Sequence, residues 1–441
     1  MRIVYLNPSG RIGGAEAALL EILVSLREAE PEWNLDLIVS EDGSLAARAR
    51  ALGVSTRVLP FPPSLGRLGD SSAGGPAGNS IGRLSLLGRL LFANREAWVY
   101  AANLRRILQQ LAPDVIHTNG FKMHLFGALA KPKEVPLIWH VHDYVRARPL
   151  MPALMKLFHR RCRIALANSN SVARDIRAAC GNSLPVQTIY NGIDTTVFSP
   201  CGDRLDLDLL SGLPPAVPDT LRVGMLATLA RWKGHEVFLR ALSLLSPDLP
   251  FRGYVIGDGL YQTDCSQRSL AELKATARQL GISERVGFTG FVDQPAAAMR
   301  ALDIVVHAST EPEPFGLVII EAMACGRAVI VSEAGGATEL IQTKRDTNSA
   351  INALGHAPGD AKLLAERITQ LATDPQLRAR LGEAGRATVE QRFNSARLAL
   401  ELVPIYERVR GRKSEVREQR SEIRSQRSDV RDQTSDSSSD R

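Results

Sequence analysis

The sequence predicts an α/β protein in which two doubly wound parallel-sheet domains face each other across a cleft. Short β-branched runs alternate with amphipathic stretches, a pattern that is typical of a parallel sheet with helices on both faces. The alternation stops at a linker rich in Pro, Asp and Gly, residues 199–220, and then begins again. The 441 residues are long enough for two hydrophobic cores of roughly 200 residues each.

The first domain is expected over residues 1–198 and the second over residues 221–388. The strands predicted in the first domain are Arg2–Leu6, Leu35–Val39, Val115–His117, Leu137–Val141, Ile164–Ala167 and Gln187–Tyr190. Those predicted in the second domain are Leu221–Leu226, Phe251–Ile256, Val286–Thr289, Ile304–His307 and Ala328–Val331. Ligands bind sheets of this kind at the carboxyl ends of the strands, so a site is expected there, in the cleft between the domains.

Two segments of the first domain lie outside this plan. Residues 61–80 are too rich in Gly, Pro and Ser to belong to a core, and we expect a mobile loop. The apolar, arginine-rich stretch Ile81–Leu91 follows the loop. It is either an interfacial helix that docks on anionic lipid or on a lipid-linked acceptor, or a helix packed on its own sheet.

Residues 413–441 repeat a seven-residue unit with one apolar position in each of its first three copies, at Val416, Ile423 and Val430. A coiled coil needs two apolar positions per heptad. We therefore expect a disordered or transiently helical appendage, with self-association as the alternative.

The formal net charge of +7 comes from the first half of the chain. Residues 1–200 hold 23 Lys or Arg and 15 Asp or Glu, whereas residues 413–441 hold seven of each. A basic stripe for nucleic acid over the whole body is therefore not expected. The basic first half favours an acceptor that is presented at an anionic membrane surface.

The five cysteines are widely spaced and include no C-x-x-C pair, which argues against a disulfide framework or a zinc site. A reducing, cytoplasmic compartment fits this usage best. The first apolar run is too short for a signal peptide, and no run of about 18 apolar residues occurs. We expect a cytoplasmic protein that, where it meets the cell membrane, lies on its inner face.

The stretch 309–326, directly after a predicted strand, contains Glu313 and Glu321, eight residues apart. Two prolines flank Glu313 and disfavour a helix there, whereas Glu321 lies more than one turn inside the helical stretch that follows. The amides that open this helix, near Gly316, form an anion site. Fully helical positions eight residues apart would lie roughly 12 Å from each other, beyond the roughly 5–9.5 Å of hydrolytic carboxylate pairs. The two glutamates are therefore expected to bind different parts of one long ligand.

The glutamate pair within EPEPFGLVIIEAMACGRAVI, followed by Gly335–Leu340, resembles the donor-site signature of glycosyltransferase family 4, which comprises retaining enzymes of GT-B fold. Further motifs stand in the family's order, namely Gly13–Glu16, Pro113–His117, His142–Asp143, Asn191–Asp194, Lys233–Gly234 and Gly257–Gly259. The resemblance covers about residues 1–410. It implies a Rossmann-like first domain for the acceptor, a Rossmann-like second domain for the nucleotide sugar, and a final helix over residues 389–412 that crosses back to the first domain.

The resemblance assigns roles to charged residues of the second domain. Glu313 would contact hydroxyls of the donor sugar, and Glu321 would hold the ribose of the nucleotide. Lys233 matches the family's phosphate-contacting lysine. The arginine that the family usually has five residues earlier is Thr228 here, so we expect Arg231 to supply the missing positive charge. The alternative for Arg231 and Lys233 is an exposed basic turn.

Helix ends complete the expected donor site. Gly13 and Gly14 open a helix whose amides would face the diphosphate, although such a pair alone also marks a simple turn. Phe315, Gly316 and Leu317 begin the helix that leads to the second glutamate and are expected at the donor as well.

His142 matches the family's active-site histidine, which approaches the donor sugar and the acceptor. Alternation along a strand sends His140 to the same face, but His142 is nearer the carboxyl end. A core or capping role is the alternative for His142. His117 and His124 are further candidates for contacts with the acceptor.

No metal and no further cofactor are expected. Asp206–Asp208 has the D-x-D form of metal-dependent transferases, but it lies in the linker and not after a core strand, so we take the match as chance. No G-x-G-x-x-G run follows a predicted strand, which disfavours a nicotinamide cofactor.

The resemblance and the motifs together predict a metal-independent, retaining glycosyltransferase of hexosyltransferase type. It would move a sugar from a nucleotide-sugar donor to a hydroxyl of a glycan, a polysaccharide precursor or a lipid-linked acceptor. Two alternatives remain. One is a catalytically idle protein of the same fold that scaffolds a polysaccharide assembly system, and the other is an epimerase or phosphorylase of that fold.

Overall fold

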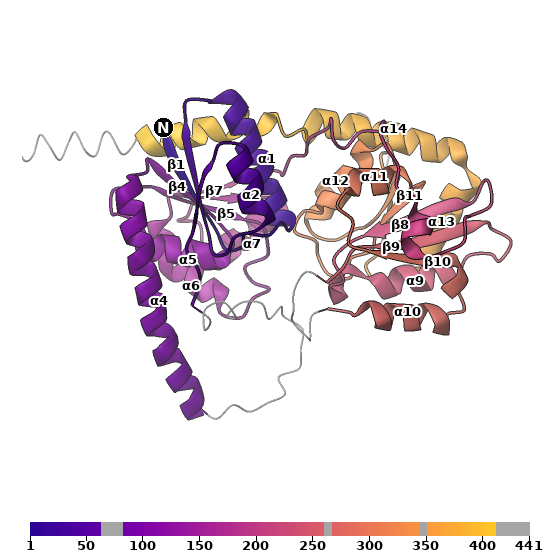
Figure 1. Cartoon of the computed structure of the whole chain (residues 1–441), viewed down its shortest axis with the longest axis horizontal. Helices are drawn as coiled ribbons and strands as arrows, with labels where there is room; N and C mark the ends of the chain where they lie inside the picture. Colours follow the sequence, from indigo (N-terminus) through magenta and orange to yellow (C-terminus); the bar gives the residue numbers. More distant parts are fainter. Residues whose placement is uncertain (63–82, 260–266, 344–350, 412–441) are drawn as a thin grey trace, which may run out of the picture.

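The computed structural model places two parallel sheets at the centres of two domains that lie side by side (Figure 1). The predicted tandem of doubly wound α/β domains is confirmed. Most of the loop expected at residues 61–80, the side chains of Ile81–Leu91 and the repeat at 413–441 lie outside the described residues. The structure describes residues 1–62, 83–259, 267–343 and 351–411, with the backbone alone for residues 83–94.

The first sheet has the strand order β3-β2-β1-β4-β5-β6-β7, and each neighbouring pair is parallel. Its strands are β1 (Arg2–Asn7), β2 (Asn34–Val39), β3 (Ser55–Val58), β4 (Val115–Asn119), β5 (Leu137–Val141), β6 (Ile164–Ala167) and β7 (Val186–Thr188). One face packs against α1 (Gly14–Ala29) and α2 (Ser44–Ala51). The other face packs against α4 (Arg83–Leu111), α5 (Phe121–Ala130), α6 (Met151–Phe158) and α7 (Asn170–Cys180).

The second sheet has the order β10-β9-β8-β11-β12-β13 and is also parallel. Its strands are β8 (Leu221–Leu226), β9 (Phe251–Ile256), β10 (Val286–Gly290), β11 (Ile304–His307), β12 (Ala328–Ser332) and β13 (Leu354–His356). One face packs against α9 (His235–Ser243), α10 (Leu270–Gln279) and α13 (Ala361–Thr373). The other packs against α8 (Leu207–Ser211), α11 (Pro295–Arg300), α12 (Leu317–Ala324) and α14 (Pro375–Arg392).

Each strand predicted from the sequence has a counterpart within a few residues of its predicted bounds. Two short strands at sheet edges, β3 and β13, were not predicted. Side chains of β3 are largely exposed, so this strand lacks the continuous apolar run that marks a buried parallel strand.

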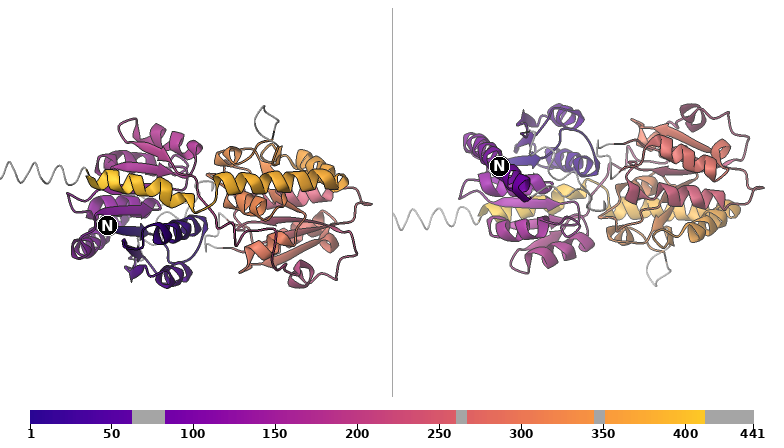
Figure 2. Two further views of the ribbon diagram at one scale, coloured as in Figure 1. Left: turned by 90° about the horizontal axis from the view of Figure 1, so that it is seen from above. Right: turned by 90° about the horizontal axis from the view of Figure 1, so that it is seen from below.

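The last helical segment crosses from the second domain to the first, but not as the single helix expected over residues 389–412. α14 ends at Arg392, and a separate helix spans residues 397–411. In the break between them, the Asn394 side chain accepts the Ala396 amide at 3.0 Å, a local bond that competes with helix formation. Figure 2 shows the second helix, in yellow, lying along the first domain.

The helix over residues 397–411 completes the core on one face of the first sheet. Leu402, Ile405 and Tyr406 are buried there together with residues of β1 and α1. The Tyr406 hydroxyl lies 2.9 Å from that of Tyr5 and 2.7 Å from His117 Nδ1. No helix among the described residues is both long and apolar enough to cross a membrane.

Candidate active site

Glu313 lies in the loop between β11 and α12, at the carboxyl edge of the second sheet. Its backbone forms a parallel bridge with Gly335, in the loop after β12. The Gly336 amide donates to the Glu313 carbonyl at 2.7 Å. A side chain at Gly336 would clash, because an added Cβ would lie 2.0 Å from the Pro314 carbonyl oxygen. The two loops therefore fix the Glu313 backbone above the strand ends.

The Glu313 carboxylate is 7% exposed, and its Oε2 atom accepts from three groups. Lys233 Nζ lies 2.8 Å away, Ser309 Oγ 3.0 Å and His307 Nε2 3.2 Å. Burial alone would raise the pKa of Glu313, but the Lys233 ammonium and the His307 hydrogen bond outweigh it and hold the pKa well below its usual range. Glu313 is therefore an ionised carboxylate at neutral pH. The three donor residues also line a small cavity beside it.

Glu321 lies just over one turn into α12 and has the opposite electrostatic environment. Burial, and then the like charge of Glu21, raise the pKa of Glu321 to about 7. Glu21 lies on α1 of the first domain, and burial raises its own pKa to about 7 as well. Two carboxyl groups that are partly protonated at neutral pH therefore interact across the two domains.

The N-termini of α1 and α12 approach each other from opposite domains. A Cβ built on Gly14 would lie 3.9 Å from a methyl carbon of Leu317. Gly316 precedes α12 with a φ of 97°, a conformation that favours glycine. The Gly13 amide is already bonded to Glu16 Oε2 at 3.2 Å. The structure thus brings the predicted helix ends together and leaves further amides of both first turns to act on an anion.

The two basic residues expected at the diphosphate point to different partners. Both lie in a 3₁₀ turn, Arg231–Lys233, after β8. Lys233 is paired with Glu313, and its ammonium also lies 3.9 Å from the centre of the Trp232 ring. Arg231 is 44% exposed, with its guanidinium 4.0 Å from Glu272 of α10. The role expected of Arg231 in place of an arginine at Thr228 stays a prediction.

His142 lies at the carboxyl edge of the first sheet among amide side chains. Its Nε2 is 3.3 Å from Asn119 Oδ1, and the Asn168 side chain donates to its carbonyl at 3.3 Å. Burial lowers the pKa of His142 to about 4, so the ring is neutral. Four buried polar atoms at this edge have no hydrogen-bond partner among the described residues: Asn7 Oδ1, Asn119 Nδ2, His142 Nδ1 and Asn168 Oδ1. Each of these atoms has unused capacity for a hydrogen bond.

The other three histidines of this region lie deeper. His140 is 1% exposed, with its ring 4.1 Å from that of His142. His117 is bonded to Tyr406, and His124 Nδ1 lies 2.7 Å from Thr118 Oγ1. His142 is therefore the least buried member of the group and the one nearest the carboxyl end of β5.

Two side chains of the first domain and one of the second join the domains beside Glu313. The Tyr144 hydroxyl donates to the Glu313 carbonyl at 3.3 Å and lies 3.0 Å from Ser171 Oγ. From the second domain, the Glu339 carboxylate accepts the backbone amides of Asn170 at 2.8 Å and Ser171 at 2.7 Å, at the start of α7. It also accepts from the Tyr190 hydroxyl at 2.9 Å.

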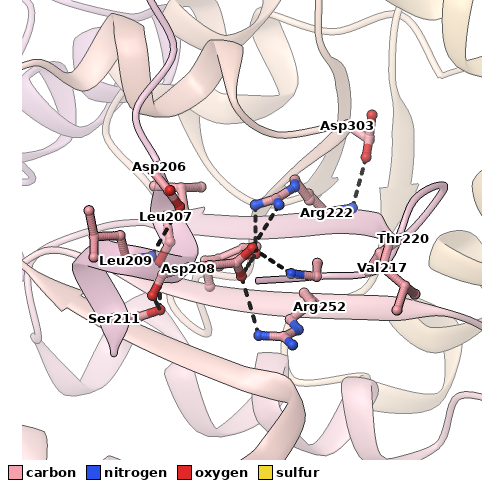
Figure 3. Close-up of polar contacts among 12 residues, drawn as sticks. Asp206, Leu207, Asp208, Leu209, Ser211, Val217, Thr220, Arg222, Arg252 and Asp303 are labelled. Atoms are coloured by element: carbon pink, nitrogen blue, oxygen red, sulfur yellow. Dashed lines mark hydrogen bonds and ion pairs between the residues drawn. The ribbon is translucent and has the colours of Figure 1, made fainter. Parts of the chain in front are cut away.

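The D-x-D run of the linker has a structural role (Figure 3). Asp206 caps α8 by accepting the Leu209 amide at 3.0 Å. Asp208 is 4% exposed and pairs with Arg222 at 2.8 Å and Arg252 at 3.3 Å, at the starts of β8 and β9. These contacts lie at the amino ends of the strands, opposite the candidate site. Among the described residues, no group of three or more His, Cys, Asp or Glu could hold a metal ion.

The family comparisons divide the chain as its two sheets do. The model of Glycosyltransferase Family 4 matches residues 12–197, and that of Glycosyl transferases group 1 matches residues 215–388. D-inositol 3-phosphate glycosyltransferase 2 of Catenulispora acidiphila is 31% identical over 322 residues, which cover 67% of this chain and 70% of that protein. The chain belongs to the group 1 glycosyltransferases of family 4.

Further relatives of this glycosyltransferase share its two-domain architecture or its sequence. Sulfoquinovosyl transferase SQD2 of Arabidopsis thaliana is 27% identical over 309 residues, which cover 65% of this chain and 56% of that protein. The crystal structure of Anabaena Alr3699/HepE in complex with UDP-glucose superposes on this chain with a TM-score of 0.72 and 25% sequence identity. The match covers 92% of this chain and 99% of the Anabaena chain. The resemblance and the predicted GT-B fold are thus confirmed.

Several residues that build the site of this glycosyltransferase were not predicted from the sequence. They are Asn7, Asn119, Asn168, Tyr144, Ser309 and Glu339. A signal existed for the asparagines, because each stands at or just after the end of a buried strand, where side chains reach the cleft. Tyr144 and Glu339 act across domains, and nothing local in the sequence marks such contacts.

Proposed function

We propose that this glycosyltransferase moves a sugar from a nucleotide-sugar donor to an acceptor hydroxyl with retention of configuration. The proposal rests on Glu313, an ionised carboxylate buried beside Lys233 at the edge of the second sheet. Such a carboxylate accepts hydrogen bonds from sugar hydroxyls, while the neighbouring ammonium attracts a phosphate. The structure of Anabaena Alr3699/HepE holds UDP-glucose, which makes UDP-sugars the first donors to test.

Each remaining site residue has a proposed role. Glu321 accepts from the ribose diol, and His142 faces the donor sugar and the acceptor. The diphosphate is neutralised by Lys233 and Arg231, without a metal ion or further cofactor. Amides of the two helix starts, at Gly13–Gly14 and at Phe315–Leu317, stabilise the same charge as it grows on the leaving group.

The reaction follows from this arrangement. The bond between the anomeric carbon and the phosphate oxygen breaks, and the acceptor oxygen forms its bond on the same face of the sugar. The departing phosphate oxygen takes the acceptor's proton. Closure of the cleft excludes water, since hydrolysis of the donor competes with transfer. The acceptor would be a glycan, a polysaccharide precursor or a lipid-linked molecule, and the enzyme would act in the cytoplasm or on the inner face of the cell membrane.

The test is Glu313→Gln, with the exposed Glu311→Gln of the same loop as the matched control. Donor binding and turnover are measured with a panel of UDP- and GDP-sugars. Glu313→Gln is expected to lower turnover by about 10² or more, because it removes a charge from the reaction centre, whereas Glu311→Gln stays at the wild-type rate. If no sugar nucleotide is turned over and Glu313→Gln binds donors as the wild type does, the proposal is wrong and a binding role is favoured.

A further inference from the structure

One segment of the first domain holds nearly all of that domain's excess charge. Residues 144–174 contain seven Lys or Arg and no Asp or Glu, which gives a formal net charge of +7. Residues 1–200 as a whole have a formal net charge of +8. The segment begins two residues after His142 and includes α6 and the 3₁₀ turn His159–Arg161 that follows it. Arg146, Lys156, Arg160 and Arg161 are exposed on it.

Two leucines stand out from the same segment. Leu150 is 73% exposed and Leu157 71% exposed. Leu150 immediately precedes α6 and Leu157 lies in its last turn, and a spacing of seven residues, almost two helical turns, puts them on one side. Met155 is fully buried on the opposite face, where α6 packs against α5 and α7. α6 thus presents a second, apolar face to solvent, and its surroundings are basic.

We propose that this face is a docking surface for an anionic lipid bilayer. We call it the α6 surface, formed by Leu150 and Leu157 with Arg146, Lys156, Arg160 and Arg161. The cations match the negative headgroups, and the two leucines enter the boundary between headgroups and acyl chains. A nucleic acid or another soluble polyanion would use the cations but would leave both leucines in water. The exposed leucines therefore favour the bilayer.

Two acidic groups next to this segment bind groups other than the side chains of its four surface cations. Asp143 is paired with Arg148 at 2.9 Å, and Asp175 accepts the backbone amides of Val145 and Arg146. Figure 1 shows α6 on the side of the first domain opposite the yellow helix 397–411.

The α6 surface adjoins the acceptor side of the cleft. The chain runs from His142 through Tyr144, which contacts the Glu313 carbonyl, to Leu150 within eight residues. A bilayer bound at α6 would lie near the carboxyl edge of the first sheet. If the proposed transfer reaction holds, a lipid-linked acceptor would reach His142 from this side; the docking itself does not depend on that reaction.

The experiment is flotation of the full chain with phosphatidylcholine vesicles, with and without phosphatidylglycerol. We expect binding only when phosphatidylglycerol is present, and a loss of about tenfold or more between low and high salt. Leu150→Ser with Leu157→Ser, and separately Arg160→Gln with Arg161→Gln, should each weaken binding by about tenfold or more. These side chains are exposed, and an unchanged melting temperature confirms folding.

Matched controls come from the second domain and the linker. Leu209→Ser with Val217→Ser removes two apolar side chains that are 76% and 67% exposed, and Arg240→Gln with Arg278→Gln removes two exposed cations. Both control pairs should bind as the wild type does. The proposal is overturned if phosphatidylglycerol vesicles do not bind, or if only the arginine pair matters and heparin competes. It is also overturned if Arg83→Glu with Arg89→Glu abolishes binding while the α6 variants retain it, because docking would then belong to Ile81–Leu91.

Discussion

Glu313 and Glu321 are eight residues apart, yet their surroundings move their pKa values in opposite directions. Lys233 and His307 lower the pKa of Glu313 despite its burial, whereas burial and Glu21 raise that of Glu321 to about 7. Glu313 is therefore charged before any ligand arrives. Glu321 is partly protonated at neutral pH and becomes charged as the pH rises above about 7.

This contrast predicts a pH dependence for nucleotide binding. Because Glu321 is protonated below about pH 7 and a ribose diol donates best to a carboxylate, affinity for UDP should fall as pH decreases from about 8 to 6, by up to tenfold per unit. Glu321→Gln should bind more weakly than the wild type at pH 8 and lose this slope. Isothermal titration calorimetry measures both. A wild-type affinity for UDP that is constant over this range would contradict the ribose-binding role of Glu321. The control is Glu383→Gln, at an exposed glutamate of α14, which should bind UDP as the wild type does.

The site could be predicted only where a residue belongs to a local motif. Glu313, Lys233 and His142 stand within recognisable runs, and the structure places each after the carboxyl end of a strand. Asn119 was missed although it stands at a strand end, because its importance also depends on which strands are neighbours, and Tyr144 was missed because its importance depends on how the domains face each other. Neither property is written into a local pattern of residues.

Among the secondary-structure elements, α8 shows how the linker is fixed to the second sheet. Asp208 accepts from Tyr254 at 2.7 Å and from the Ala216 amide at 3.1 Å, in addition to its two arginines. Burial alone would raise the pKa of Asp208, but these hydrogen bonds and the Arg222 charge lower it below its usual value of 3.8. One carboxylate thus joins α8 to β8 and β9.

Asp208→Asn should therefore destabilise the second domain. Removing one partner of a buried ion pair costs about 3–5 kcal/mol, because Arg222 and Arg252 lose their counter-charge. Since the folded-state pKa is lowered, the wild type has this contribution above about pH 4 and loses it as pH falls further. Urea unfolding at pH 7 and at pH 3 should show a large difference between variant and wild type at the higher pH and a smaller one at the lower. An equal difference at both would contradict this account.

Elements buried on both faces were predictable, whereas two of the four edge strands, β3 and β13, were not. Strands such as β12 are almost entirely apolar, because helices cover them on both sides. β13 has only three residues, and the break between α14 and the last helix depends on a side-chain bond at Asn394. Short elements and breaks leave too little periodicity in the sequence to be recognised.

On the scale of the whole molecule, hydrogen bonds made by Tyr144 and by Glu339 join the two domains. Tyr144 contacts the backbone of Glu313, and Glu339 binds the first amides of α7. A carboxylate at a helix N-terminus is stabilised by both the amides and the helix dipole. The first domain therefore contacts the loop that carries Glu313 directly.

Glu339→Gln should shift the molecule toward an open form. Loss of the charge at α7 costs about 1–2 kcal/mol, which changes the ratio of open to closed molecules by about 5–30-fold. The radius of gyration from small-angle X-ray scattering should rise and kcat should fall, while the melting temperature changes little, because each domain keeps its own core. Identical scattering curves for Glu339→Gln and wild type would contradict this role.

The helix over residues 397–411 has a consequence for how the protein is made. It supplies Leu402 and Tyr406 to the core around β1, yet it leaves the ribosome roughly 20–80 s after that strand. The second domain, complete by Phe393, can fold in the meantime. The first domain is therefore synthesised first but completes its core last. Until the helix over residues 397–411 is made, an apolar face of α1 stays exposed to solvent, where a chaperone could bind it.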